Sequence, residues 1–242
     1  MAAVIPLPLS FPWEGARQTL FPTLLLDGSD AVLIDCGYPG FLPRLEEALH
    51  AVGAAPTDLT AVVITHHDDD HMGALAQLKR AYPQVRILAG AEEAPYISGE
   101  KKSLRLIQAE ALQPTLPPEA QDWGRQFRRR LAAVEPAPVA DLLRGGDILP
   151  WCGGCQVIAT PGHTPGHISL FLPAFSMLIP GDAAVVEHGA LVVANPQFTL
   201  DLPAARQSLA LLRSLPWDTC LCYHGGIFRR QMRFPARELP EA

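Results

Sequence analysis

The chain has 242 residues, a length that suits one large α/β domain. Hydrophobic residues make up 48% of it and charged residues 18%, so there is ample material for a buried core. The formal net charge of −6 gives no general attraction to nucleic acid or to an anionic membrane, and we expect neither as a partner.

The first third of the chain alternates predicted strands and helices. Short apolar runs bounded by Pro, Gly or Asp predict strands, and apolar residues at helical spacing predict helices. Strands are expected at residues 4–9, 19–26, 31–35, 59–65 and 85–89, and helices at 39–52 and 72–81. The run at 59–65, LTAVVIT, is rich in β-branched residues and leads directly into a charged segment.

Residues 91–138 differ in character from the rest. Two helical patterns, at 101–112 and 118–134, are separated by the turn-rich stretch QPTLPP. We expect a helical insertion that forms a lid over the site. Its arginines, Arg125 and 128–130, form either an attractive surface for an anionic substrate or simply a solvated helix face. The aromatic candidates for the walls of a pocket are Tyr96, Trp123, Phe127 and Phe198.

The strand pattern resumes after the insertion. Strands are expected at 147–151, 156–160, 168–172, 177–179 and 219–222, and a helix at 202–215. Gly153 and Gly154 predict a two-residue hairpin turn that makes Cys152 and Cys155 face each other across strands. No repeat and no long linker divides the chain, so we predict a single domain over residues 1–242.

The apolar runs, the N-terminus and the cysteines bear on the cellular location of the protein. No apolar run approaches the 18 residues of a membrane-spanning helix, and the N-terminus does not resemble a secretory signal. Five cysteines are an odd number at low density, which is not typical of a disulfide framework. We therefore expect a cytoplasmic protein without a membrane partner.

Six of the eight histidines lie in three short blocks, each after a predicted strand. The first block is Thr65-His66-His67-Asp68-Asp69-Asp70-His71-Met72-Gly73. Carboxylates this close together repel one another unless they and the neighbouring imidazoles bind cations. Zinc binds both His nitrogen and Asp oxygen. The other interpretations are a solvated acidic loop before a helix and a ligand register built on His67 and Asp69.

Three later blocks favour the metal interpretation. The segment 160–167, TPGHTPGH, presents His163 and His167 at the ends of tight turns. Asp182 follows the apolar run MLIP, and His224 follows TCLC. The loops at strand ends are where a rigid sheet presents functional groups, so we expect these blocks to meet.

The ordered set HxDxDH, GH, GD and H resembles the metallo-β-lactamase superfamily, whose usual first motif is HxHxDH. The resemblance covers residues 20–230 and implies a four-layer αββα sandwich with two metal ions at one edge of its sheets. It implies one metal site from His66, Asp68 and His163, and a second from Asp70, His71 and His224, with Asp182 bridging both ions. Asp35 and His167 are expected to orient these ligands rather than to bind metal.

Asp68 stands where the family usually has a histidine. With Asp68, Asp70, Asp182 and a bridging hydroxide against two divalent ions, the site is expected to be formally neutral rather than positive. A third carboxylate also favours harder ions such as iron or manganese. Zinc is nevertheless the first expectation, because the chain carries no flavodoxin-like domain to deliver electrons.

The resemblance implies a dinuclear hydrolase of a small-molecule substrate. Two ions about 3.5–4 Å apart lower the pKa of a shared water toward 7, and the hydroxide attacks an ester-like bond. Asp70 and Asp182 are the expected catalytic carboxylates, with Asp70 passing a proton to the leaving group. A lactone or thioester is the favoured substrate, then a phosphodiester or β-lactam. A diiron oxidoreductase and a non-catalytic metal-binding sensor are the alternatives.

Overall fold

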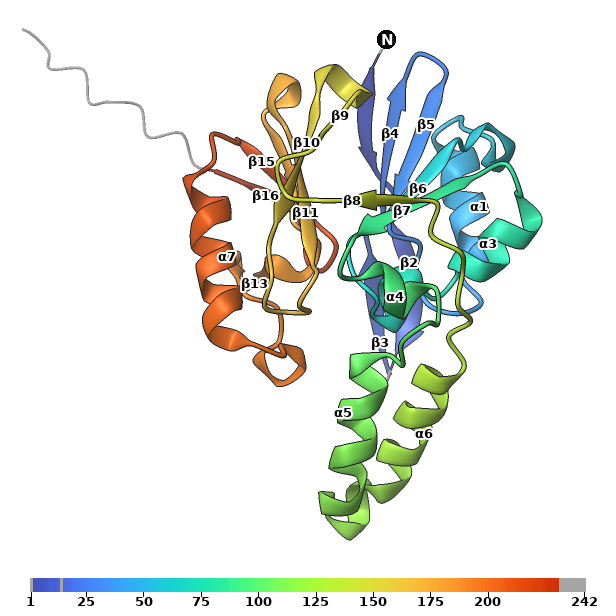
Figure 1. The fold of residues 1–242 in the computed structure, drawn as a ribbon, viewed down its shortest axis with the longest axis vertical. Coiled ribbons are helices and arrows are strands. Elements are labelled where there is room, and N and C mark those ends of the chain that lie inside the picture. The colour runs from blue at the N-terminus through green and yellow to red at the C-terminus, as the bar shows by residue number, and fades with distance from the viewer. Residues whose placement is uncertain (1, 14, 231–242) are drawn as a thin grey trace, which may run out of the picture.

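The computed structural model describes residues 2–13 and 15–230, and the outer ends of the predicted 1–242 domain lie outside these ranges. Its two six-stranded sheets run in the orders β1-β4-β5-β6-β7-β8 and β16-β15-β12-β11-β10-β9 (Figure 1). The first comprises β1 (Ala3–Pro6), β4 (Thr23–Asp27), β5 (Asp30–Ile34), β6 (Ala61–Ile64), β7 (Arg86–Gly90) and β8 (Asp141–Leu143). The second comprises β9 (Ile148–Leu149), β10 (Cys155–Ala159), β11 (Ile168–Leu172), β12 (Met177–Ile179), β15 (Thr219–Cys222) and β16 (Gly226–Arg229).

Two small hairpins, seven α-helices and seven short 3-10 helical segments complete the regular structure of the described part of the chain. The hairpins are β2 (Leu9–Trp13) with β3 (Ala16–Leu20), and β13 (Val185–Glu187) with β14 (Ala190–Val192). The helices are α1 (Leu42–Ala51), α2 (Asp69–Met72), α3 (Leu75–Ala81), α4 (Ala94–Ile97), α5 (Leu104–Leu112), α6 (Gln121–Ala132) and α7 (Leu202–Ser214).

Alternating side chains place each sheet between two cores. In β6, Val63 belongs to the core between the sheets, whereas its neighbours Val62 and Ile64 belong to a second core on the outer face of their sheet. In the other sheet, Leu170 faces the inner core and Phe171 a third core. Both faces of these strands are therefore apolar, which explains their continuous hydrophobic runs.

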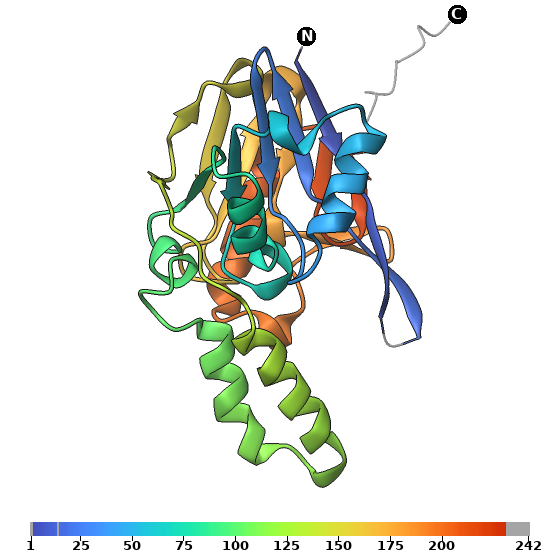
Figure 2. The same cartoon turned by 90° about the vertical axis from the view of Figure 1, so that its right-hand side faces the viewer.

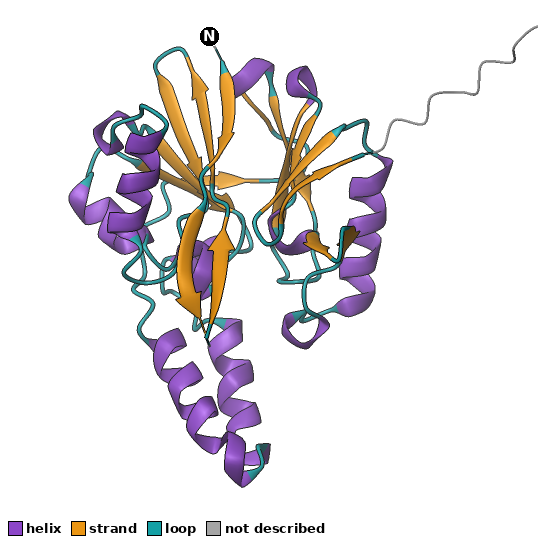
Figure 3. Ribbon diagram, turned by 180° about the vertical axis from the view of Figure 1, so that it is seen from behind, coloured by secondary structure: helices purple, strands orange, loops and turns teal. Residues whose placement is uncertain are grey.

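Helices cover the two outer faces. Leu45 of α1 and Leu75 of α3 lie in the same core as Val62, and Leu209 of α7 lies in the same core as Phe171. Figures 1 and 3 show α1 and α3 on one outer side of the paired sheets and α7 on the other. The four layers are helix, sheet, sheet and helix, so the predicted αββα sandwich is confirmed.

The predicted helical insertion lies between two neighbouring strands of one sheet. It leaves from β7 and returns to β8, which pairs with β7 in parallel. Figure 2 shows α5 and α6 side by side, projecting from the sandwich at one end. Gly124 of α6 lets the segment that connects the two helices pack closely on α6, because a Cβ there would lie 2.4 Å from Leu116. The helix pair therefore places side chains of the insertion next to one end of the sandwich.

Several predicted elements are divided or shortened in the structure. The strands predicted at 4–9 and 19–26 are each two strands, because the chain leaves the large sheet for the β2–β3 hairpin near Pro8 and Pro22, which lack an N–H. The helix predicted at 72–81 is also two, broken at Gly73, where the chain approaches Pro39 too closely for a side chain. Of the strand predicted at 147–151, only Ile148–Leu149 is a strand.

The predicted pairing of Cys152 with Cys155 is wrong. Residues Trp151–Gly153 form a turn of 3-10 helix, and Cys155 is opposite Leu149 rather than Cys152. Cys152 adopts a left-handed φ of 52°, and its amide donates to Asp27 Oδ2 of β4, which ties this turn to the other sheet. All five cysteines are unpaired and buried.

Among the described residues, no helix combines the length and the apolar character that a membrane crossing requires.

Candidate metal centre

The histidine and aspartate blocks meet at one edge of the two sheets. His66, Asp68, Asp70 and His71 follow β6, and His163 lies in the turn between β10 and β11. Asp182 follows β12, and His224 follows β15. Each block follows a short strand that packs into the apolar cores on the two faces of its sheet. The chain therefore fixes these side chains through its most rigid elements.

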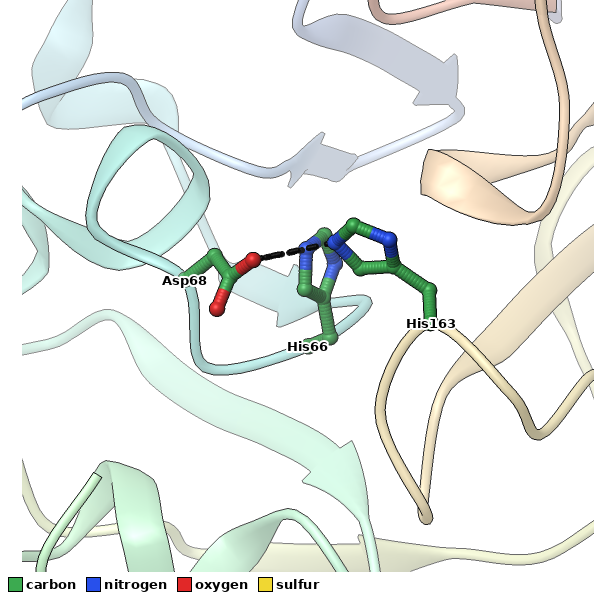
Figure 4. A group of neighbouring side chains, drawn as sticks. All are labelled: His66, Asp68 and His163. Atoms are coloured by element: carbon green, nitrogen blue, oxygen red, sulfur yellow. Dashed lines mark hydrogen bonds and ion pairs between the residues drawn. The ribbon is translucent and has the colours of Figure 1, made fainter. Parts of the chain in front are cut away.

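One group consists of His66, Asp68 and His163, drawn in Figure 4. Asp68 Oδ2 lies 2.9 Å from Nε2 of His163 and 3.6 Å from Nε2 of His66. All three residues are buried. Two imidazole nitrogens and one carboxylate oxygen thus converge on one point, which is a donor set that zinc accepts.

A second group consists of Asp70, His71 and His224. Asp70 Oδ2 lies 3.1 Å from Nε2 of His224 and 3.9 Å from Nε2 of His71. The side chain of His224 is 33% exposed, whereas that of His71 is fully buried. This group therefore has an open side.

Asp182 lies between the two groups. Its Oδ1 is 3.2 Å from Nε2 of His71 and 3.4 Å from Nε2 of His224, and its Oδ2 is 3.5 Å from Nε2 of His163. One oxygen faces each group, which is the arrangement that a bridging carboxylate needs. The backbone there depends on Gly181, whose φ is +53° and where a Cβ would lie 2.7 Å from Nε2 of His167.

Unsatisfied polar atoms show that the cluster suits cations. Nε2 of His66, Nε2 of His71 and Oδ1 of Asp182 are buried without a hydrogen bond to any described residue. Buried polar atoms are otherwise almost always hydrogen-bonded. Burial by itself would lower the pKa of His71, but Asp182, Asp35 and Asp70 raise it well above its usual value. The excess negative charge that attracts a proton here also attracts a metal ion.

Thr65 and Asp35 determine which nitrogens point inward. Asp35 Oδ2 accepts hydrogen bonds from Thr65 Oγ1 and from Nδ1 of His71, both at 2.8 Å. Because Thr65 Oγ1 donates to Asp35, it accepts from Nδ1 of His66, 3.1 Å away. Nδ1 of both histidines then carries a proton, and Nε2 is the nitrogen directed into the site, where a cation can replace a proton.

Asp35 has a strained backbone that its contacts compensate. Its φ is +60°, a conformation uncommon for residues other than glycine. The Asp35 N–H donates to Val63 and its Oδ1 accepts from the Thr65 amide. Strained residues of this kind are concentrated at functional sites. The structure brings Asp35 to the position expected for a residue that orients ligands.

His167 lies behind the cluster rather than in it. Its Nε2 accepts the Asp182 N–H at 2.9 Å, and its Nδ1 lies 2.8 Å from Thr160 Oγ1. Burial lowers its pKa to about 3, so it is neutral and accepts through Nε2. His167 thus holds the backbone of Asp182.

The alternative register built on His67 and Asp69 does not match the structure. His67 turns away from the cluster, hydrogen-bonds Glu93 through Nδ1 and stacks on Tyr96 at 4.6 Å. Asp69 accepts from Arg130 Nε at 2.6 Å. Neither residue belongs to a group that could hold a metal ion.

Glu93 is a supporting residue that sequence reasoning missed. Its Oε2 accepts from the His67 N–H, and its Oε1 accepts from Thr164 Oγ1 at 2.7 Å and from the Gly166 N–H at 2.8 Å. Burial alone would raise the pKa of Glu93, but the hydrogen bonds with His67, Thr164 and Gly166 lower it. The signal was present, because Glu93 follows a strand as the other functional blocks do.

Arg105 of α5 was also missed, and no feature of the sequence near it points to the site. Its Nη2 donates to Asp68 Oδ2 at 2.7 Å, and its Nε lies 3.3 Å from each Asp68 oxygen. Nη2 is also 3.4 Å from Nε2 of His163, and the residue is only 3% exposed. Burial alone would raise the pKa of Asp68, but Arg105 and the two histidines lower it well below its usual range.

The arginine-rich face of α6 contributes one residue to the site. The Arg130 guanidinium lies over the rings of Trp13, Tyr38 and Phe127 at 4.8, 5.4 and 5.1 Å and pairs with Asp69. Arg125 pairs with Asp122 on the exposed side of the helix, and Arg129 is exposed. For those two, the interpretation as a solvated helix face holds.

A pocket of about 260 Å³ opens onto the cluster. The expected wall residues Phe127 and Phe198 line it, together with Tyr38, Ala194 and Asn195. The other two expected wall residues, Trp123 and Tyr96, line neighbouring hollows instead. The pocket therefore has aromatic walls, one of which comes from the insertion, and a polar floor at the cluster.

Comparison with known proteins gives consistent results. The family model described as the metallo-beta-lactamase superfamily matches residues 22–225. The probable metallo-hydrolase YflN of Bacillus subtilis is 30% identical over 212 residues, covering 80% of this chain and 75% of the relative. A hydroxyacylglutathione hydrolase of Synechococcus is 29% identical over 188 residues, covering 74% of this chain and 55% of the relative.

Solved structures share the fold. A metallo-beta-lactamase family protein from Thermus thermophilus superposes with a TM-score of 0.70 at 23% identity, over 93% of this chain and 74% of that one. A metallo-beta-lactamase from Cronobacter sakazakii gives a TM-score of 0.61 at 23% identity, over 89% and 78% of the two chains.

Proposed function

The chain belongs to the metallo-beta-lactamase superfamily and is a metal-dependent hydrolase, and from this premise we propose that it uses two metal ions to cleave an ester-like bond in a small molecule. The observation that carries the proposal is the position of Asp182, with one oxygen toward each of two His/Asp groups. Zinc is the proposed metal, because four imidazoles supply nitrogen donors to the two groups.

In this proposal, His66, Asp68 and His163 hold one ion, and Asp70, His71 and His224 hold the other, with Asp182 shared. Such ions, when bound, activate water at neutral pH and stabilise negative charge on the attacked group. Asp35 and His167 hold the ligands in the orientation that binding needs. Asp70, which lines the pocket, would accept the proton that the attacking water gives up and pass it to the leaving group.

A thioester is the favoured substrate class, and a lactone is next. The support comes from relatives named hydroxyacylglutathione hydrolase, whose named substrate is a thioester. The chain spans about half the length of these particular relatives, so their substrate is carried over only as a class. The pocket volume of about 260 Å³ suits a short acyl group, and Phe127 and Phe198 offer it an apolar wall.

The test combines metal analysis with a substrate panel. Protein grown in zinc-, iron- or manganese-supplemented medium is assayed for metal content and for hydrolysis of thioesters, lactones, phosphodiesters and β-lactams. We expect two zinc ions per chain and the fastest turnover with a thioester. Asp70→Asn is expected to lower kcat at least a hundredfold, because it removes a carboxylate ligand of the second ion and the group that passes the proton. The zinc content of this variant separates the two losses. Full activity in Asp70→Asn or in Asp182→Ala would contradict the proposed roles.

The same experiment separates the other interpretations. Two irons with a visible absorption band would indicate the diiron oxidoreductase, since a third carboxylate donor also suits harder ions than zinc. Metal-loaded protein that hydrolyses none of the panel would indicate a metal-binding sensor. The five unpaired thiols support the cytoplasmic location expected from the sequence, which remains part of the proposal.

A further inference from the structure

Arg105 makes an ion pair with a residue of the proposed metal site, although it belongs to the helical insertion. Its Nε and Nη2 both donate to the Asp68 carboxylate, and its Nη1 donates to Gln108 at 2.7 Å. The guanidinium also lies over the Phe198 ring at 5.4 Å. Charged side chains this deeply buried are rare unless their charge is matched. The position is therefore built for a specific opposite charge.

The positive charge of Arg105 offsets the negative charge that Asp68 adds to the proposed metal site. Asp68 alone would give the two proposed metal sites a third negative charge where the usual motif has a neutral histidine. Arg105 contributes one positive charge at hydrogen-bond distance from the same oxygen. The protein charge around the site is then that of Asp70 and Asp182 only, as it would be with histidine at position 68. The formally neutral site expected from the sequence leaves out this guanidinium, and with Arg105 included the formal charge is +1.

We propose that Arg105 is a positioning residue that gives Asp68 the net charge of a histidine ligand, so that the insertion completes the metal site. This inference rests on the proposed metal centre. The carboxylate keeps Oδ2 directed at His163 and His66 because two donors of Arg105, Nε and Nη2, hold it from one side. Charge and orientation are then set by the same contact.

Recognition of an anionic substrate is a weaker explanation for Arg105. Three of its N–H groups already donate to Asp68 and Gln108, and the residue is 3% exposed. A substrate anion would have to compete with a buried carboxylate that touches the same atoms. If recognition were its role, Arg105→Gln would raise KM and leave metal affinity unchanged.

The test is a double-mutant cycle of Asp68→His and Arg105→Gln, with Arg129→Gln as a control on the exposed face of the same insertion. The measured quantities are zinc affinity by chelator competition, zinc content, and the thermal midpoint with and without zinc. Zinc affinity and thermal midpoint do not depend on catalysis, so a change in substrate binding alone cannot produce the expected pattern.

Asp68→His alone is expected to lower zinc affinity at least tenfold, because the unmatched guanidinium then repels the ion at close range. Arg105→Gln alone is expected to lower the thermal midpoint of the metal-free protein by about 6–12 °C and to enlarge the rise on adding zinc, since the ion takes over as partner of Asp68. The double variant is expected to recover wild-type zinc affinity to within about threefold.

Equal zinc affinity in Asp68→His and in the double variant would overturn the proposal, as would an Arg105→Gln variant whose thermal midpoint responds to zinc as the wild type does. Wild-type protein that holds two zinc ions would, in that event, leave the proposed function intact. Wild-type protein that binds no metal from any medium would instead remove the proposed function itself. Should Asp68→His fail to fold, the response of Arg105→Gln to zinc still decides the matter.

Discussion

At the scale of the residue, metal binding depends on which ring nitrogen of each histidine carries the proton as much as on the distances between the ligands. His71 presents the lone pair of Nε2 because its Nδ1 donates to Asp35 Oδ2. His66 does the same through Thr65, which itself donates to Asp35. One carboxylate thus sets the protonated nitrogen of two proposed ligands in two different groups. Its left-handed backbone, with φ of +60°, places it where both can be reached.

Replacing Asp35 by Asn is expected to disturb this arrangement without changing side-chain size. The new NH₂ group must face either Thr65 or Nδ1 of His71, and in the second case His71 carries its proton on Nε2, where it blocks the metal. We expect zinc affinity to fall by about 10–100-fold, measured by chelator competition. Asp218→Asn, at an exposed position, is the matched control. Unchanged affinity in Asp35→Asn would exclude Asp35 from this role.

Most residues of the cluster could be predicted from the sequence. Arg105, which was not predicted, shows why the prediction was incomplete. Motif order and spacing identified the histidines and aspartates that the structure brings together. Arg105 lies 37 residues from Asp68 in a helix with ordinary periodicity, and only the packing of the insertion brings the two together. The charge count made from the sequence was therefore incomplete.

At the scale of the element, Glu93 connects three loops. It joins the loop after β6 through His67, the turn before β11 through Thr164 and Gly166, and its own segment before α4. His67 in turn accepts the amide of Leu104 at the start of α5. The insertion is thus fastened to the candidate metal loop through a buried carboxylate.

Replacing Glu93 by Gln should destabilise the fold by about 3 kcal/mol, because its amide donor would face the donors on His67 or Thr164 inside the core. Since the folded state lowers the pKa of Glu93, its stabilising contribution is complete above its usual pKa of 4.5 and is lost as the pH falls through the lower folded value.

Urea titrations from pH 7 to pH 3 provide the measurement for Glu93→Gln. The gap in unfolding free energy between wild type and variant should be constant above pH 4.5 and narrow below it. Glu92→Gln, at the exposed neighbouring position, should show no gap. A gap that stays the same at low pH would mean that the ionised form of Glu93 is not what stabilises these loops.

Element boundaries were harder to predict than element types. The strands predicted at 177–179 and 219–222 coincide with β12 and β15, because apolar runs bounded by Pro, Gly and Asp leave little choice. The prediction failed where the chain changes sheets at proline, as at Pro22, and where an element is too short to repeat the period that would identify it. The two-residue strand β9 and the helix α4 are examples of the second kind.

At the scale of the whole molecule, stability and metal binding reside in different places. Three apolar cores run along the sheets and the helices that cover them, and the candidate metal centre lies at one edge. None of the proposed ligands is needed to bury these cores. The sandwich should therefore remain folded when metal is removed, unlike small zinc domains that depend on the ion for folding.

Removal of metal with a chelator should lower the thermal midpoint by about 8–16 °C while leaving the far-ultraviolet circular dichroism unchanged at 25 °C. This estimate follows from about 4 kcal/mol of linkage at a thousandfold excess over Kd. Restoring zinc should restore the midpoint. Loss of secondary structure on chelation would show that the ions, rather than the three cores, hold the sandwich together.

The ion pair between Arg105 and Asp68 also constrains how this lineage could have diverged. A histidine at position 68 would leave Arg105 as a stranded charge, and loss of Arg105 first would leave a bare carboxylate in the interior. We expect each single replacement to be harmful alone and the pair together to be nearly neutral. Exchange of Asp for His at this position therefore has to cross an epistatic barrier, which requires a change in the insertion as well as in the motif.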